Sequence, residues 1–150
     1  MRVSDILRVK GNTLYTITPE EPLANAAATM ADKDIGSLVV MDQGKLVGML
    51  TFREVIVALV GNGGAVGNTI VRAAMDPAPV TCTLDTDLDD TRRIMLDRHA
   101  RYMPVMDKHM LMGVISFYDV AKAVVDSQNF ENKMLKAYIR DWPAEEGEQS

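Results

Sequence analysis

The sequence predicts a mixed α/β (α+β) fold in which one strand, helix, strand, strand, helix unit is built twice. Aligning residues 15–60 with residues 80–125 without a gap gives 14 identities in 46 positions, where average residue usage would give roughly three. Each copy also ends in the same small polar signature, Gly48-x-x-Thr51-x-x-Glu54 and Gly113-x-x-Ser116-x-x-Asp119. A repeat of about 65 residues is too long for a solenoid unit and suits a small folding unit that is duplicated.

Length and composition place both copies in one compact protein. The chain has 150 residues, of which 47% are hydrophobic, so the two units are expected to share a core. A net charge of −5 argues against nucleic acid or an anionic membrane as a partner. Cys82 is the single cysteine, and the longest apolar run, residues 55–60, is far too short for a membrane span. We therefore predict a soluble, cytoplasmic protein.

The first copy shows each element of the unit in order. A short β-rich run at 15–18 is followed by Pro19 and Pro22, which are typical of a helix start. An almost continuous apolar strand at 37–41 and a second strand at 45–50 flank the hairpin turn 42–44. A helix is expected from Phe52 to about Val60. The first of the two predicted helices has an apolar face made of Leu23, Ala26, Ala27 and Met30.

The second copy repeats this order. Its predicted elements are a strand at 80–83, a helix at about 87–98, a strand at 103–106, a turn at 107–109, a strand at 111–115 and a helix from 117 to about 126. A short helical segment is expected before each copy, at 3–7 and at 71–75.

The predicted domain organisation is therefore a first repeat at 1–60, a linker at 61–69, a second repeat at 70–126 and a C-terminal helix with an acidic tail at 127–150. Residues 61–68 hold four glycines, but no Gly-Lys-Ser/Thr follows them, so a flexible linker is favoured over a phosphate-binding loop. Apolar residues recur at helical spacing between Phe130 and Trp142. This stripe has to pack on its own chain or on a second subunit.

The repeated signature has a purely structural interpretation. A Thr or Ser at a helix N-cap with Glu three residues later forms a capping box, which satisfies two backbone amides without any ligand. Glu54 is long enough to reach back to the N-cap amide, whereas Asp119 is one carbon shorter. We therefore expect Glu54 to cap its own helix and Asp119 to be the better outward-facing acceptor.

The same signature also has a functional interpretation. The N-terminus of a helix presents unpaired amides and the positive end of the helix dipole, so phosphate is favoured there, with the Thr51 or Ser116 hydroxyl as a further donor. A carboxylate one turn into the helix can accept hydrogen bonds from both hydroxyls of a ribose. The residues thus indicate a ribonucleotide site.

The duplicated set of motifs resembles a tandem of cystathionine-β-synthase (CBS) domains over residues 3 to about 126. The matching segments are 3–7, Thr18-Pro19 with Leu23 and Met30, 37–48, 103–107 and both terminal signatures. The resemblance implies two repeats that pack sheet against sheet about a pseudo-twofold axis and leave two clefts between them. It also implies an adenosyl ligand, with AMP first and ATP, ADP or NAD(H) as alternatives.

Site residues follow from the resemblance, residue by residue. One cleft is expected to hold the ribose on Asp119 and the phosphate on Ser116, next to Tyr118. Its wall from the other repeat is expected to come from Lys10, Asn12, Thr13, Thr16, Ile35, Gly36 and Ser37. The second cleft would combine Thr51, Arg53 and Glu54 with Thr81, Ala100 and Arg101. Glu54 stands where the family has Asp, so ribose binding there is expected to be weaker.

The resulting hypothesis is a non-catalytic regulatory module that binds an adenine nucleotide or dinucleotide, forms a homodimer and acts on an unidentified protein target. No nucleophile is paired with a base, and no metal ligand set or cofactor site for catalysis is expected. His99 and His109 lack further ligands, and Cys82 is expected to be a buried, inert thiol. Two alternatives remain open: a ligand-free dimerisation module, and a small nucleotide hydrolase that uses Asp119 or Glu54.

Overall fold

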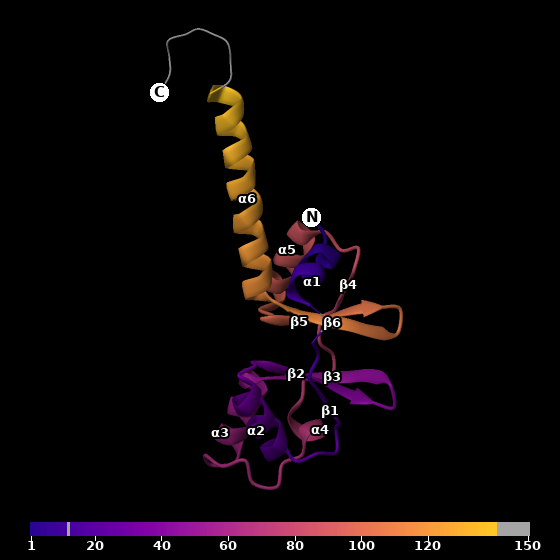
Figure 1. Cartoon of the computed structure of the whole chain (residues 1–150). Helices are drawn as coiled ribbons and strands as arrows, with labels where there is room; N and C mark the ends of the chain where they lie inside the picture. Colours follow the sequence, from indigo (N-terminus) through magenta and orange to yellow (C-terminus); the bar gives the residue numbers. More distant parts are fainter. Residues whose placement is uncertain (12, 141–150) are drawn as a thin grey trace.

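The computed structural model describes residues 1–11 and 13–140 and has two three-stranded sheets, each with its own helices (Figure 1). Asn12 and Trp142, on which two of the expectations fall, lie outside the described residues. The elements of the first half are α1 (Val3–Lys10), β1 (Thr16–Ile17), α2 (Leu23–Lys33), β2 (Ser37–Asp42), β3 (Lys45–Thr51) and α3 (Phe52–Gly61). Those of the second half are α4 (Val71–Ala74), β4 (Cys82–Thr83), α5 (Leu88–Arg98), β5 (Tyr102–Asp107), β6 (Met110–Ser116) and α6 (Phe117–Arg140).

The two sheets have the same topology and register. The strand orders are β1-β2-β3 and β4-β5-β6, with one parallel and one antiparallel pair in each sheet. The antiparallel register shifts at Val40/Met41 in one sheet and at Val105/Met106 in the other, which are equivalent positions of the repeat. The predicted α/β fold of two repeats is confirmed. The sheets face each other across the middle of the molecule, where β3 contacts β6 (Figure 1).

The short helices that precede each repeat pack on the opposite repeat. Val3, Ile6 and Leu7 of α1 are buried in the core of the second sheet, and in Figure 1 α1 lies beside α5 and β4. Val71 of α4 is buried in the core of the first sheet. This exchange, which the repeat alignment did not predict, ties the two units together at both ends.

The glycine of each signature makes room for this exchange. A Cβ added at Gly113 would lie 2.9 Å from Leu7 Cδ2. A Cβ at Gly48 would lie 2.6 Å from Met75 Sδ and 2.8 Å from the carbonyl oxygen of Asp76. Both glycines are therefore explained by close packing of the exchanged segment on the sheet.

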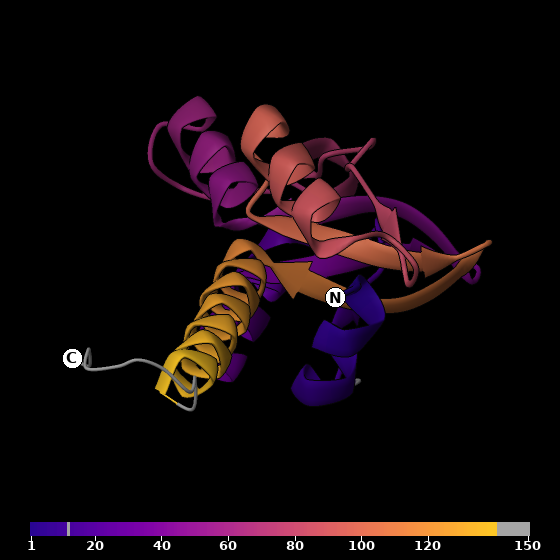
Figure 2. The same ribbon diagram turned by 90° about the horizontal axis from the view of Figure 1, so that it is seen from above.

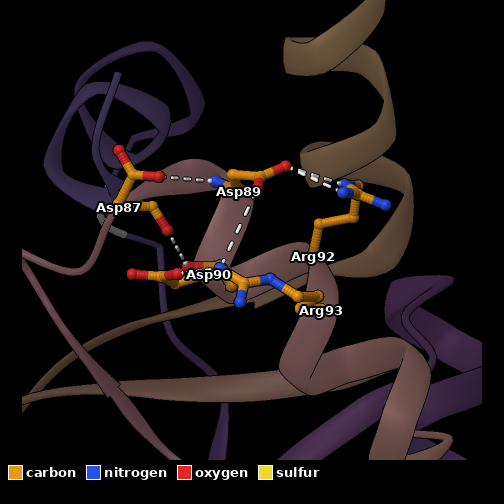
Figure 3. A network of polar contacts seen from close by, with 6 residues as sticks. Asp87, Asp89, Asp90, Arg92 and Arg93 are labelled. Carbon is orange, nitrogen blue, oxygen red and sulfur yellow. Dashed lines mark hydrogen bonds and ion pairs between the residues drawn. The ribbon is translucent and has the colours of Figure 1, made fainter.

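Helix α5 begins in a cluster of charged residues (Figure 3). The Asp87 carboxylate accepts a hydrogen bond from the Asp89 amide at 3.0 Å and caps the helix. Asp89 pairs with Arg92 at 2.8 Å, and Asp90 pairs with Arg93. Acidic groups in a first helical turn are favoured by the helix dipole, so the network serves the helix start.

Helix α6 is one continuous helix from Phe117 to Arg140, whereas the sequence analysis expected a helix ending near Asp126 and a separate segment after it. No glycine or proline interrupts residues 117–140, so nothing in the sequence ends the helix between them. Its second half projects beyond the body of the protein (Figure 1), while Figure 2 shows α1 on the same side as α6. The two helices contact each other at the base of α6.

Candidate functional site

The capping box predicted at the start of α3 is present. The Thr51 amide donates to Glu54 Oε1 at 2.7 Å, and the Thr51 hydroxyl donates to the same oxygen at 2.6 Å. The Thr51 hydroxyl oxygen accepts from the Arg53 amide at 3.2 Å. Glu54 Oε2 lies 3.6 Å from Arg53 of the same helix, and the glutamate side chain is only 13% exposed. Glu54 Oε1 is therefore committed to its own helix, whereas Oε2 accepts no hydrogen bond in the described part of the chain.

The start of α6 is capped in the same way, and here the expectation was wrong. The Ser116 amide donates to Asp119 Oδ2 at 2.8 Å, and the Asp119 amide donates to Ser116 Oγ at 3.0 Å. An aspartate at the third helical position is thus long enough to reach the N-cap amide. The same bond occurs in α1, where the Arg2 amide donates to Asp5 at 2.8 Å.

Asp119 differs from Glu54 through a lysine that comes from α1. Lys10 Nζ donates to Asp119 Oδ2 at 2.7 Å and to the carbonyl oxygen of Val114 at 2.9 Å. Within the described ranges, Asp119 Oδ1 accepts no hydrogen bond. One oxygen of this carboxylate is saturated and the other is open.

The charge on Asp119 is stabilised by these contacts. Burial alone raises the pKa of the carboxyl, but the hydrogen bonds from Lys10 and from the Ser116 amide outweigh it, and the pKa is lowered from its ordinary value of 3.8. Asp119 is therefore an anionic acceptor at neutral pH.

A cleft with a volume of about 850 Å³ opens beside Asp119, and we name it the Asp119 cleft. It is large enough for a nucleotide-sized ligand. Among the predicted site residues, the following line it: Lys10, Thr13, Ile35, Gly36, Ser37, Ser116 and Tyr118. Asp119, with a side chain 19% exposed, does not line the cleft itself; it bonds to two residues that do, Lys10 and Ser116. Thr16 is on β1 and not among the described lining residues.

A second cleft, of about 710 Å³, opens beside Glu54 and is named the Glu54 cleft. The predicted residues Thr51, Arg53, Glu54, Ala100 and Arg101 line it. Thr81, which was also predicted for this cleft, is not among its lining residues in the described part of the chain. Arg98 and His99 from the end of α5 also line this cleft, together with the acidic residues Glu54 and Asp76.

Arg101 and Tyr102 line both clefts, although the sequence analysis placed Arg101 in the Glu54 cleft only and did not select Tyr102. The carbonyl oxygen of Arg101 accepts from the Phe117 amide at 2.8 Å, which fixes this segment next to the start of α6. A Cβ added at Gly36 would overlap the Tyr102 hydroxyl, so any larger residue there would require Tyr102 to move.

The described part of the chain offers few other groups that could react or bind a metal. Cys82 is buried, and burial raises the pKa of its thiol to about 12, so it is protonated at neutral pH. No cluster of three potential metal ligands occurs among residues 1–11 and 13–140. No helix within those ranges is long and apolar enough to cross a membrane.

The chain has the architecture of a paired regulatory domain, with two sheets, exchanged helices and two clefts that each have a capped helix beside them. Comparison with known proteins supports this class. The CBS domain family model matches residues 3–61 and 71–126. The chain belongs to the CBS domain family. It is 29% identical over 106 residues to the CBS domain-containing protein YhcV of Bacillus subtilis, an alignment that covers 71% of this chain and 75% of that protein.

Solved structures show the same fold. The CBS-domain containing protein ATU1752 from Agrobacterium tumefaciens is 34% identical, with a TM-score of 0.78 over 82% of this chain and 98% of that chain. The CBS domain pair of protein MJ0100 is 23% identical, with a TM-score of 0.73 over 83% of this chain and 99% of that chain. That structure contains 5′-methylthioadenosine and S-adenosyl-L-methionine.

Proposed function

We propose that this CBS pair is a non-catalytic regulatory module that binds an adenosyl ligand in the Asp119 cleft. The observation that carries the proposal is the Asp119 carboxylate, which is charged, is fixed by the Ser116 amide, accepts no hydrogen bond on Oδ1 and lies directly behind Lys10 and Ser116 of a nucleotide-sized cleft. A ribose offers two adjacent hydroxyl donors, which such a carboxylate can accept. The adenosyl ligands bound by the MJ0100 pair support this ligand class.

The cleft supplies the remaining contacts from both repeats. Tyr118, which is 72% exposed, and Ile35 from the first repeat both line the cleft. These residues offer an apolar surface for an adenine ring. The Ser116 hydroxyl and the N-terminal end of α6 favour a phosphate. AMP is the first candidate, and ADP, ATP and NAD(H) share the same adenosine.

Discrimination against 2′-deoxyadenosine nucleotides tests the ribose contact. Loss of one hydrogen bond to a charged group costs about 1.5 to 3 kcal/mol, or roughly ten- to a hundredfold in affinity. Calorimetry should show this loss for 2′-deoxy-AMP on the wild type and not on Asp119→Ala. Equal binding of the two nucleotides to the wild type would remove Asp119 from the site.

A homodimer is the second part of the proposal. Large apolar side chains on the projecting half of α6 are exposed: Phe130 by 65%, Met134 by 58%, Leu135 by 57% and Ile139 by 62%. An exposed apolar stripe of this kind is stabilised by pairing with a second subunit. Deletion of residues 127–150 should convert a dimer into a monomer in sedimentation, and a monomeric full-length protein at micromolar concentration would refute this part.

A partner protein that responds to ligand occupancy, and a location in the cytoplasm, remain predictions. The alternative of a nucleotide hydrolase is tested by phosphate release that disappears in Asp119→Ala. The alternative of a ligand-free dimerisation module predicts no rise in melting temperature with any nucleotide.

A further inference from the structure

Lys10 binds one oxygen, Oδ2, of the Asp119 carboxylate that the proposed ligand needs. Its ammonium group binds Asp119 Oδ2 at 2.7 Å and the Val114 carbonyl oxygen at 2.9 Å. Lys10 lines the Asp119 cleft, whereas Asp119 is not among the lining residues and is less exposed than the lysine. Oδ2 already accepts two hydrogen bonds, from Lys10 and from the Ser116 amide.

The second copy of the repeat has no such lysine. Residues 71–80, which precede the second copy, contain no lysine, and Glu54 is approached instead by Arg53 of its own helix at 3.6 Å. The contact between Lys10 and the capping carboxylate therefore occurs at the Asp119 cleft and has no counterpart at the Glu54 cleft.

Lys10 is also placed so that it can leave Asp119. It is the last residue of α1, its side chain is 38% exposed, and Gly11 follows with a φ of 95° and open space around it. A lysine has a flexible four-carbon stem and a compact charge. The ammonium group can therefore change partner without moving the helix.

We propose that Lys10 selects adenosyl ligands that carry a phosphate, by exchanging Asp119 for the phosphate when the ligand binds. The inference rests on the proposed ribose contact. A ribose that uses both carboxylate oxygens displaces Lys10 from Oδ2 and leaves a partly desolvated ammonium without its partner, which is costly. A phosphate supplies a new partner, whereas an uncharged nucleoside supplies none and a sulfonium ligand repels the ammonium.

The inference predicts opposite effects of one substitution on two ligands. In Lys10→Met no ammonium group has to be displaced from the Asp119 carboxylate, so adenosine should bind more tightly than to the wild type. AMP loses its ammonium partner and should bind about tenfold more weakly. The preference of the wild type for AMP over adenosine, expected to be about tenfold or more, should therefore fall to near unity.

Calorimetric titration of the full chain with AMP and with adenosine tests this. Arg8→Met is the matched control, since Arg8 is on the same helix, pairs with Asp5 at 3.1 Å and does not line the cleft. Lys10→Arg, which keeps the charge, should keep the preference for AMP. Because the readout is a ratio of two affinities measured on one variant, a smaller folded fraction does not change it.

Each outcome has one meaning. An unchanged AMP-to-adenosine ratio in Lys10→Met, or the same loss of ratio in Arg8→Met, overturns the selection by Lys10 and leaves the adenosyl site intact. Failure of the wild type to bind either ligand refutes the proposed function, and the inference with it.

Discussion

Helices α3 and α6 begin with the same cap, yet the carboxylates that close the two caps have different surroundings. Glu54 uses one oxygen for Thr51 and directs the other to Arg53 of its own helix. Asp119 is held on one oxygen by Ser116 and by Lys10 from the exchanged helix α1, and its other oxygen is open. The repeated motif therefore builds the helix start, and residues outside the motif decide whether the carboxylate can serve a ligand.

The largest expected difference between the repeats concerns their equivalent glycines. Gly48→Ala meets the carbonyl oxygen of Asp76, whose backbone is held by two hydrogen bonds to Met49. Gly113→Ala meets only the flexible end of Leu7. Urea unfolding should show a loss of about 3 kcal/mol for the first change and about 1 kcal/mol for the second. Equal losses would mean that the exchanged segments pack alike on both sheets.

The caps themselves should behave alike. Thr51→Ala and Ser116→Ala each remove the hydroxyl that accepts from a first-turn amide. Each should cost about 1 kcal/mol of unfolding free energy. If the Ser116→Ala change has no effect on stability while Thr51→Ala does, the equivalence of the two caps is wrong.

The smallest expected effect is a dependence of stability on acid pH that comes from Asp119. Its pKa is lower in the folded chain than its ordinary value of 3.8, so its charge stabilises the fold above pH 3.8, and this contribution is lost as the pH falls below that value. Thermal melts of Asp119→Asn and the wild type should therefore converge below pH 3.8. A difference that grows in acid would reverse the sign of this contribution.

The sequence predicted the local structure better than the packing between the repeats. The duplicated pattern was sufficient for the order of strands and helices, and the cap formed by Glu54 was expected from its spacing to Thr51. The exchange of α1 and α4 was missed because an alignment of two copies does not say on which copy a preceding helix packs. The packing of Leu7 on Gly113 and of Met75 on Gly48 and the burial of Val71 in the core of the first sheet reveal it.

The candidate site was predicted in part for the same reason. Most residues named for the two clefts line them, although Asp119 does not. The expectation that Asp119 fits the capping role less well than Glu54 was wrong. An aspartate at this position reaches the N-cap amide at 2.8 Å in both α1 and α6. What distinguishes Asp119 from Glu54 is instead the contact with Lys10, which depends on packing between distant segments.

The central claim is that the Asp119 cleft, and not the Glu54 cleft, binds adenosine through its ribose. Titration calorimetry of AMP into the wild type, Asp119→Ala and Glu54→Ala tests it most directly. Asp119→Ala should remove the tighter binding event, with a loss of roughly ten- to a hundredfold in affinity, and Glu54→Ala should leave that event nearly unchanged. Loss of the tighter event in Glu54→Ala, with Asp119→Ala binding like the wild type, would contradict the account.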